Sequence, residues 1–190
     1  MVDPREQLQH WAAGRSCLMG IGNLECGDDG FGVRLMRAIE ERLGRGAPDA
    51  RRPRFVDAGL EPERFIGRVS AEEVDHLVFL DAVDFGGEPG SIIFADAGEM
   101  AARFPQISTH KLSLGLLAKC VEENGHTRAW LVGVQPQSLG SVEGLTPEVA
   151  ATLEALTDLL CEAWTTEKRG GEAPGDRGER PASAMGQVNV

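Results

Sequence analysis

The sequence has 190 residues, 42% hydrophobic and 26% charged, a size and composition typical of one globular domain rather than two. Its 19 basic and 30 acidic residues give a formal net charge of −11, which disfavours nucleic acid or a membrane surface as a partner. No stretch is apolar over the roughly 18 residues that a membrane span needs, and the first residues contain no secretory signal. We therefore expect a cytoplasmic protein with free thiols, because none of its four cysteines has C-x-x-C spacing.

Apolar runs that predict strands alternate with amphipathic stretches that predict helices. In chain order we expect a strand at Cys17–Ile21, a helix at Gly30–Leu43, a strand at Arg54–Asp57, a helix at Glu63–Val74, strands at His76–Val83 and Ser91–Phe94, a helix at Lys111–Glu123, a strand at Ala129–Val134 and a helix from Pro147 to Trp164. Thr146 is the expected N-cap of the last helix, because Thr before Pro is a common helix start.

This alternation predicts a three-layer α/β sandwich, with a mostly parallel twisted sheet of about five strands and helices on both faces. The run HLVFLDAV is apolar almost throughout, as expected for a strand covered on both sides. Residues 83–91 are too few for a helical crossover and contain two Gly-rich turns. A hairpin there would make Ser91–Phe94 antiparallel to the strand before it.

The predicted domain organisation is an N-terminal arm at 1–16, a single α/β domain at 17–167 and a tail at 168–190. The tail is rich in Gly, Pro, Glu, Arg and Ala and has no hydrophobic periodicity. Such a composition is typical of a disordered segment.

A glycine-rich turn joins the first strand to the first helix, which is where a dinucleotide-binding fingerprint would lie. Gly20 and Gly22 fit G-x-G-x-x-G, but Glu25 occupies the third glycine position. Asp28 and Asp29 would also repel a pyrophosphate. A nucleotide-binding protein therefore stays as a weaker alternative.

Three residues are candidates for a catalytic or metal-contacting site: Asp29, Asp81 and His110. Asp29 follows the first strand, Asp81 interrupts the most apolar strand near its end, and ligands of α/β sheets bind at the carboxyl ends of strands. Structural roles are open as well. One of Asp28 and Asp29 can cap the following helix, Asp84 can cap a loop, and His110 can be a surface residue in a capping turn.

Two carboxylates and one imidazole would make an open site for a loosely held divalent ion, unlike the closed thiolate site of a structural zinc. A different catalytic scheme would use Cys26 as nucleophile and His110 as base. We regard it as the weaker one, because the acidic neighbours of Cys26 disfavour a thiolate.

Several sequence blocks, taken in order, resemble the hydrogenase maturation endopeptidases. The resemblance extends over about residues 17–164 and rests on Gly20-x-Gly22-Asn23, Gly27-Asp28-Asp29-Gly30, Asp57-x-Gly59, Asp81-Ala82-Val83-Asp84, Phe85-Gly86-Gly87-Glu88-Pro89-Gly90, Ser108-Thr109-His110-Lys111, Gly133-Val134-Gln135-Pro136 and Gly144-Leu145-Thr146-Pro147. Leu24-Glu25-Cys26 and Leu60 depart from the usual family residues.

The resemblance implies a small cytoplasmic α/β endopeptidase that removes a C-terminal extension from the precursor of a NiFe hydrogenase large subunit. It implies that nickel is contributed by the substrate protein, that the protease has no tightly bound cofactor of its own, and that Asp29, Asp81 and His110 contact the nickel. A non-hydrolytic nickel-binding carrier for hydrogenase assembly is the alternative, although carriers more often contain His-rich or Cys-rich tracts.

Overall fold

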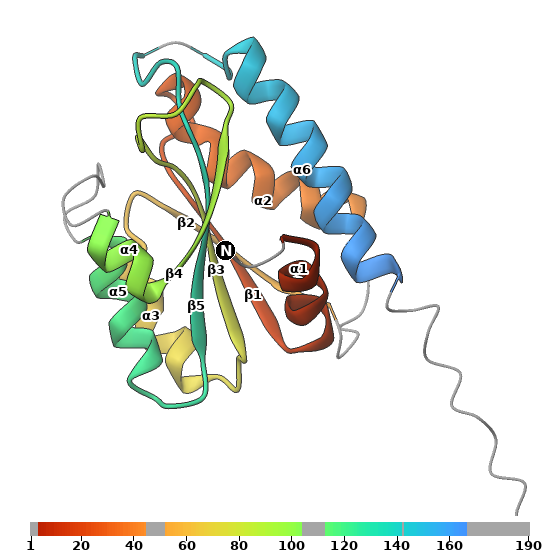
Figure 1. Ribbon diagram of the computed structural model, residues 1–190, viewed down its shortest axis with the longest axis vertical. Helices are drawn as coiled ribbons and strands as arrows, with labels where there is room; N and C mark the ends of the chain where they lie inside the picture. Colours follow the sequence, from red (N-terminus) through yellow and green to blue (C-terminus); the bar gives the residue numbers. More distant parts are fainter. Residues whose placement is uncertain (1–3, 45–51, 104–112, 142, 167–190) are drawn as a thin grey trace, which may run out of the picture.

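The computed structural model describes residues 4–44, 52–103, 113–141 and 143–166, and the central element is a twisted five-stranded sheet (Figure 1). Its strands, in the order β2-β1-β3-β5-β4, are parallel except for β4, which is antiparallel to β5. They span Ser16–Ile21 (β1), Arg54–Gly59 (β2), His76–Ala82 (β3), Ile92–Asp96 (β4) and Arg128–Val134 (β5).

Six α-helices and one 3-10 helix make up the rest of the described fold. They are α1 (Pro4–Ala13), η1 (Gly27–Gly30), α2 (Phe31–Arg42), α3 (Glu63–Ala71), α4 (Ala97–Arg103), α5 (Leu114–Glu122) and α6 (Pro147–Thr166). Among the residues described, no helix is both long and apolar enough to cross a membrane.

The helices form two layers, one on each face of the sheet. Helices α1, α2 and α6 share one core with Leu18, Val78 and Leu80, whereas α3, α4 and α5 share the other with Leu77 and Phe79. Successive side chains of β3 therefore enter opposite cores. This explains why the strand is apolar throughout and confirms the predicted three-layer sandwich with helices on both faces.

The one prediction of strand pairing that is wrong concerns β4. It runs opposite to β3, as expected, but the two strands do not form a hairpin, because β5 lies between them. The loop from Val83 to Ser91 crosses over the end of β5 instead. The backbone of Gln135 holds it there, since the Gly90 N–H donates to the Gln135 carbonyl and the Gln135 N–H donates to the Ser91 carbonyl, at 2.9 and 2.8 Å.

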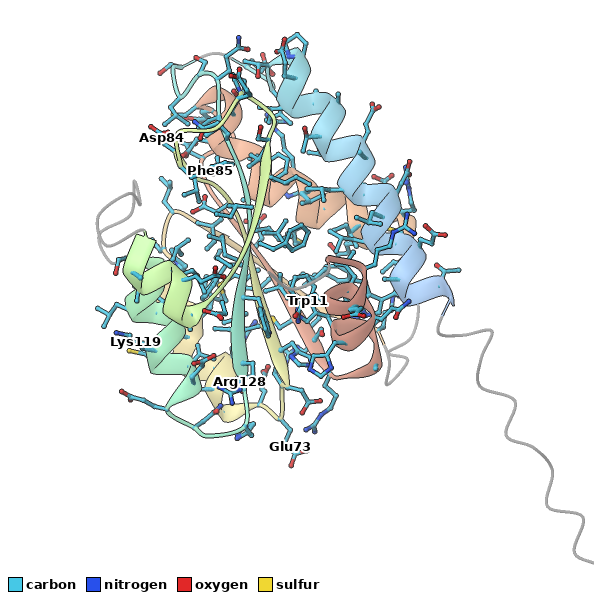
Figure 2. All side chains as sticks on the ribbon, viewed as in Figure 1. Trp11, Glu73, Asp84, Phe85, Lys119 and Arg128 are labelled. Atoms are coloured by element: carbon cyan, nitrogen blue, oxygen red, sulfur yellow. The ribbon has the colours of Figure 1, made fainter. Side chains whose placement is uncertain are left out.

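Two helices add to the elements expected from the sequence. Helix α4 directly follows β4, and α1 lies within residues 1–16, which we expected to be an arm. Helix α1 inserts Leu8 and the fully buried Trp11 into the core formed with α6 and β5. Figure 2 shows Trp11 between its helix and the sheet.

Candidate active site at the carboxyl edge of the sheet

The four parallel strands all end at one edge of the sheet, and the loops after them form the candidate site. Figure 2 shows Asp84 and Phe85 near this edge, with Glu73 and Arg128 at the opposite edge. Ligands of open α/β sheets bind at the carboxyl ends of the strands, because the loops there present backbone groups and polar side chains.

The turn after β1 has a shape that only glycine permits. Gly22 has φ of +125°, and a Cβ added to it would lie 1.7 Å from the carbonyl oxygen of Asp29. The Gly22 N–H donates to the Gly59 carbonyl oxygen at 2.9 Å, which ties the turn to the end of β2. The turn therefore brings the chain after β1 into contact with the residue that we expected to be functional.

Glycine also allows α2 to begin directly over the strand ends. A Cβ on Gly32 would lie 1.9 Å from the Leu80 carbonyl oxygen and 2.5 Å from that of Ile21. The first turn of α2 thus contacts the ends of both β1 and β3. Its partial positive charge lies near the carboxylates of this edge.

Asp29 is buried, with 5% of its surface exposed, and lies in η1 just before α2. Its Oδ2 accepts a hydrogen bond from the Asn23 N–H at 2.7 Å. Neither Asp28 nor Asp29 caps a helix, because η1 and α2 begin without a side-chain capping bond. The alternative that one of them caps the following helix is therefore wrong.

The same contacts argue against a nucleotide at this turn. Phosphate cradles of the dinucleotide type need free backbone N–H groups after the first strand. Here the Gly22 N–H is bonded to Gly59 and the Asn23 N–H is bonded to the Asp29 carboxylate.

Asp81, near the end of β3, is 2% exposed, and its Oδ1 accepts a hydrogen bond from the Ala82 N–H at 2.8 Å. Burial and the negative charge of Asp29 raise the pKa of Asp81 well above its ordinary value, against the effect of the Ala82 hydrogen bond. The two carboxylates therefore lie close enough for the charge of Asp29 to affect the ionisation of Asp81. The structure brings together two of the three predicted residues.

His110, the third, lies outside the described residues, but the helix that follows it is placed. Ser113 is the N-cap of α5, and its Oγ accepts from the Leu116 N–H at 3.3 Å. The other end of α5 leads to Thr127, whose hydroxyl donates to the Val74 carbonyl just before β3 begins. Helix α5 therefore begins near the edge of the sheet where the parallel strands end.

Asp28 has a different role from its neighbour. It is fully buried, and its carboxylate accepts hydrogen bonds from the N–H groups of Gln137, Ser138 and Thr146 at 2.9, 3.0 and 2.7 Å. The Thr146 hydroxyl lies 3.1 and 3.0 Å from its two oxygens. Burial acts to raise the pKa of Asp28, but the backbone hydrogen bonds outweigh it and hold the pKa below its ordinary value.

Thr146 immediately precedes α6, as expected for an N-cap, but its hydroxyl is bonded to Asp28. Asp28 thus fastens the segment between β5 and α6 to the helical turn that contains Asp29. The sequence does not predict this function of Asp28. The sequence indicates only that one acid more than a helix cap needs is present, because Asp28 and Asp29 are adjacent.

Gln135 fastens the other loop of this edge, between β3 and β4. Its buried side-chain oxygen accepts from the N–H groups of Phe85 and Gly87 at 2.9 and 3.1 Å, and its Nε2 donates to Asp84 Oδ1 at 3.0 Å. Asp84 also accepts from the Gly86 N–H at 3.1 Å, so it is the loop-capping carboxylate that the sequence left as an option. These hydrogen bonds, the one from Gln135 first, lower the pKa of Asp84.

Cys26 lies partly exposed beside Asn23, whose Nδ2 donates to its sulfur at 3.1 Å. Within the described ranges, no three His, Cys, Asp or Glu side chains form a group that could hold a metal ion. These residues include two buried carboxylates, Asp29 and Asp81. Carboxylate oxygens are the donors that suit a hard or borderline cation.

Comparisons with known proteins agree with the fold and the sequence blocks. Residues 33–163 match the family model described as hydrogenase maturation protease. The chain is 33% identical over 151 residues to the hydrogenase 2 maturation protease of Escherichia coli. The alignment covers 77% of this chain and 88% of that protein.

Two solved structures are similar as well. The NiFe hydrogenase maturation protease HycI from Thermococcus kodakarensis has a TM-score of 0.71 and 32% identity, covering 84% of this chain and 99% of that one. The hydrogenase maturating endopeptidase HybD from E. coli has a TM-score of 0.64 and 28% identity, covering 83% and 94%. With the family model matching more than half of its length, this chain belongs to the hydrogenase maturation proteases and is a hydrolase.

Proposed function

We propose that this protein removes the C-terminal extension of a NiFe hydrogenase large-subunit precursor, and that it recognises nickel already bound in the precursor through Asp29, Asp81 and His110. The nickel belongs to the substrate. The protease would therefore cleave only a precursor that already contains the metal.

The observation that carries the proposal is the buried carboxylate pair. Asp29 and Asp81 are 5% and 2% exposed, and the charge of Asp29 is among the causes that raise the pKa of Asp81. Two buried like charges destabilise each other unless a proton or a cation compensates them. A divalent ion on a docked precursor would be attracted by both carboxylates, so the pair would favour a metal-loaded partner over an empty one.

The position of α5 supports the inclusion of His110. In β3, Asp81 has the same parity as Leu77 and Phe79, whose side chains enter the core formed with α3, α4 and α5. Ser113, three residues after His110, begins α5 on that layer. An imidazole nitrogen together with two carboxylate oxygens makes an incomplete ligand set, which leaves positions for ligands from the precursor.

The chain's own residues would orient and hold the substrate metal. Asn23 fixes Asp29 through its N–H, Ala82 fixes Asp81, and Asp28 holds the adjacent loop so that η1 keeps its position. A water molecule polarised at or near the metal would attack the peptide bond. An empty precursor would lack the ion that anchors it, and discrimination would come from this difference in affinity.

The test is a processing assay on one large-subunit precursor prepared with and without nickel, read by mass spectrometry of the cut product. The wild-type protein should process the loaded precursor and leave the empty one intact. Asp81→Asn and His110→Ala should abolish processing while their circular dichroism spectra stay unchanged. Cys26→Ser is the matched control and should remain active, because a hydroxyl is a much weaker nucleophile than a thiolate.

Processing of the empty precursor at the normal rate would refute recognition of nickel. Full activity of Asp81→Asn or His110→Ala would refute the site, and complete loss of activity in a folded Cys26→Ser protein would favour a cysteine nucleophile. Binding of nickel-loaded precursor without any cleavage would favour the alternative of a carrier.

A further inference from the structure

Strand β2 is an edge strand of the described sheet. Strand β2 pairs with β1 on one side, and no strand among the described residues pairs with its other side. An edge strand presents backbone N–H and C=O groups that can pair with another extended chain. This edge is therefore able to accept a strand from a partner.

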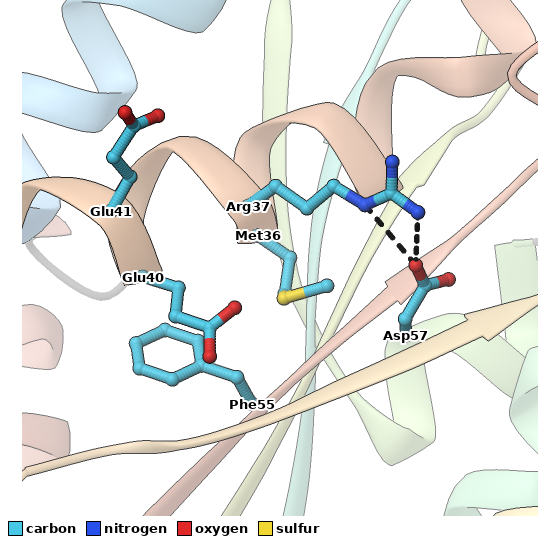
Figure 3. Close-up of a pocket in the computed structure, with 6 residues that line it drawn as sticks. All are labelled: Met36, Arg37, Glu40, Glu41, Phe55 and Asp57. Carbon is cyan, nitrogen blue, oxygen red and sulfur yellow. Dashed lines mark hydrogen bonds and ion pairs between the residues drawn. The ribbon is translucent and has the colours of Figure 1, made fainter. Parts of the chain in front are cut away.

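A groove of about 520 Å³ runs beside this edge, between β2 and α2. Figure 3 shows described residues that line it: Met36, Arg37, Glu40, Glu41, Phe55 and Asp57. Met36 is buried and Phe55 is partly buried, so both contribute apolar surface. The other four lining residues are charged.

The charges of the described lining residues do not balance. Among them Arg37 is the one basic residue, and it donates to Asp57 Oδ2 from Nε and Nη2 at 3.2 and 2.6 Å. Glu40 and Glu41 leave an excess of negative charge, and the close-up shows Glu40 beside the Phe55 ring. A lysine or arginine side chain has the complementary shape and charge, because its stem packs on apolar surface and its head group pairs with carboxylates.

Strand β2, which borders the groove, ends at the candidate active site. Asp57 lies two residues before the end of β2, and the Gly59 carbonyl accepts from the Gly22 N–H in the turn whose Asn23 holds Asp29. Leu60, the next residue, is 51% exposed. A peptide extended along β2 would advance by about 3.3 Å per residue, so the groove would take a side chain a few positions away from the bond that is cut.

We propose that the C-terminal extension of the precursor binds as an added strand along β2, with a lysine or arginine side chain in the groove between Phe55 and Glu40. This inference rests on the proposed function. The occupant is an extended basic segment rather than a helix, because the edge offers backbone pairing and the groove offers one side-chain pocket beside it.

The test compares kcat/KM for the nickel-loaded precursor among the wild-type protein, Glu40→Lys and Glu123→Lys. Glu123 is an exposed acid next to α5, on the opposite face of the sheet, so its replacement makes the same change in net charge away from β2. Glu40→Lys should lower kcat/KM about tenfold, mainly by raising KM, and Glu123→Lys should change it by less than about twofold.

A second precursor, with the lysines and arginines of its extension replaced by glutamate, provides a reciprocal charge reversal. It should be a poor substrate for the wild-type protein and a better one for Glu40→Lys, because the pair is restored with opposite signs. Hydrogen exchange should also show the amides of β2 protected when the unaltered precursor binds.

Equal kcat/KM for Glu40→Lys and Glu123→Lys, no rescue by the reversed extension, or unprotected β2 amides would each overturn the inference. So would a concentration-dependent dimer of the wild-type protein that Glu40→Lys dissociates, because the edge would then bind a second copy of the chain. In all these cases the wild-type protein still cuts its substrate. If it does not cut the loaded precursor at all, the proposed function itself fails.

Discussion

Asp28 and Asp29 are adjacent in the sequence but have opposite surroundings. Asp28 accepts hydrogen bonds from three backbone N–H groups and a hydroxyl, whereas Asp29 adds negative charge beside the buried Asp81. The hydrogen bonds stabilise the carboxylate of Asp28, whereas the charge of Asp29, together with burial, destabilises the carboxylate of Asp81. Replacing Asp28 and Asp81 by their amides should therefore change stability in opposite directions.

Asp28→Asn should lower the free energy of unfolding at pH 7 by about 3 kcal/mol, because an amide is uncharged and its NH2 group cannot accept the bonds that the second oxygen accepts. Urea unfolding followed by circular dichroism measures the change. The wild-type pKa of Asp28 is lowered, so its contribution is present above the ordinary carboxyl range and is lost as the pH falls through the lowered value. An equal loss at pH 7 and at pH 2 would contradict this account.

Asp81→Asn should have the opposite effect on stability. The pKa of Asp81 is raised in the folded state, so the wild-type protein loses stability as the pH rises from the ordinary carboxyl range through the raised value. The amide does not ionise, and it keeps an oxygen for the Ala82 N–H. The melting temperature of the variant should exceed that of the wild type by about 3 °C at pH 7.5, with a smaller difference at pH 4.5.

A variant that melts below the wild type at pH 7.5 would show that the buried charge of Asp81 is compensated without a ligand. The comparison needs no substrate, so it tests the electrostatics of the pair independently of the proposed function.

Asp29 and Asp81 can be predicted as candidates from the sequence because both break expected patterns. Asp29 is a second acid before a helix, and Asp81 is a charge near the end of an apolar strand. The functions of Asp28 and Gln135 cannot be predicted in this way. The partners described above are 48 to 118 residues away in the chain, as in the bonds from Gly87 to Gln135 and from Thr146 to Asp28, and no local pattern encodes such a pairing.

At the scale of secondary structure, strands were the easiest elements to predict. Strand β3 is covered on both faces, so nearly all of its residues are apolar and the pattern is unambiguous. The sequence pattern does not predict helices α1 and α4, for different reasons. Helix α1 is largely polar and buries few large side chains, while α4 has only seven residues and follows β4 without a loop.

Helix α1 should matter for stability although it lies outside the predicted domain. Trp11 is fully buried, with its ring centroid 6.0 Å from that of Trp130 and 6.2 Å from that of Phe94. Trp11→Ala should therefore lower the free energy of unfolding by about 4 kcal/mol. Gln9→Ala, at an exposed position of the same helix, is the control and should be nearly neutral. Equal stability of the two variants would mean that α1 contributes little to the core.

At the scale of the whole molecule, the boundary at residue 168 remains a prediction. The sequence from Lys168 to Val190 contains few large apolar residues and cannot bury enough surface to offset the entropy of ordering it. Deleting it should leave the melting temperature and the rate of precursor processing unchanged within experimental error. A clear loss of either would show that the segment contributes to folding or to substrate binding.

The position of β5 between β3 and β4 also has a consequence for the order in which the protein folds. Thirty-one residues separate the end of β4 from the start of β5, and among the described strands β4 pairs with β5 alone. While the chain is being synthesised, Ile92, Ile93 and Phe94 therefore have no strand to pair with, because β5 has not yet left the ribosome. During that interval β3 lacks the neighbour on its β5 side as well. The nascent protein thus passes through a stage in which unpaired strand edges are prone to aggregation. A chaperone that binds extended apolar segments would act at this stage.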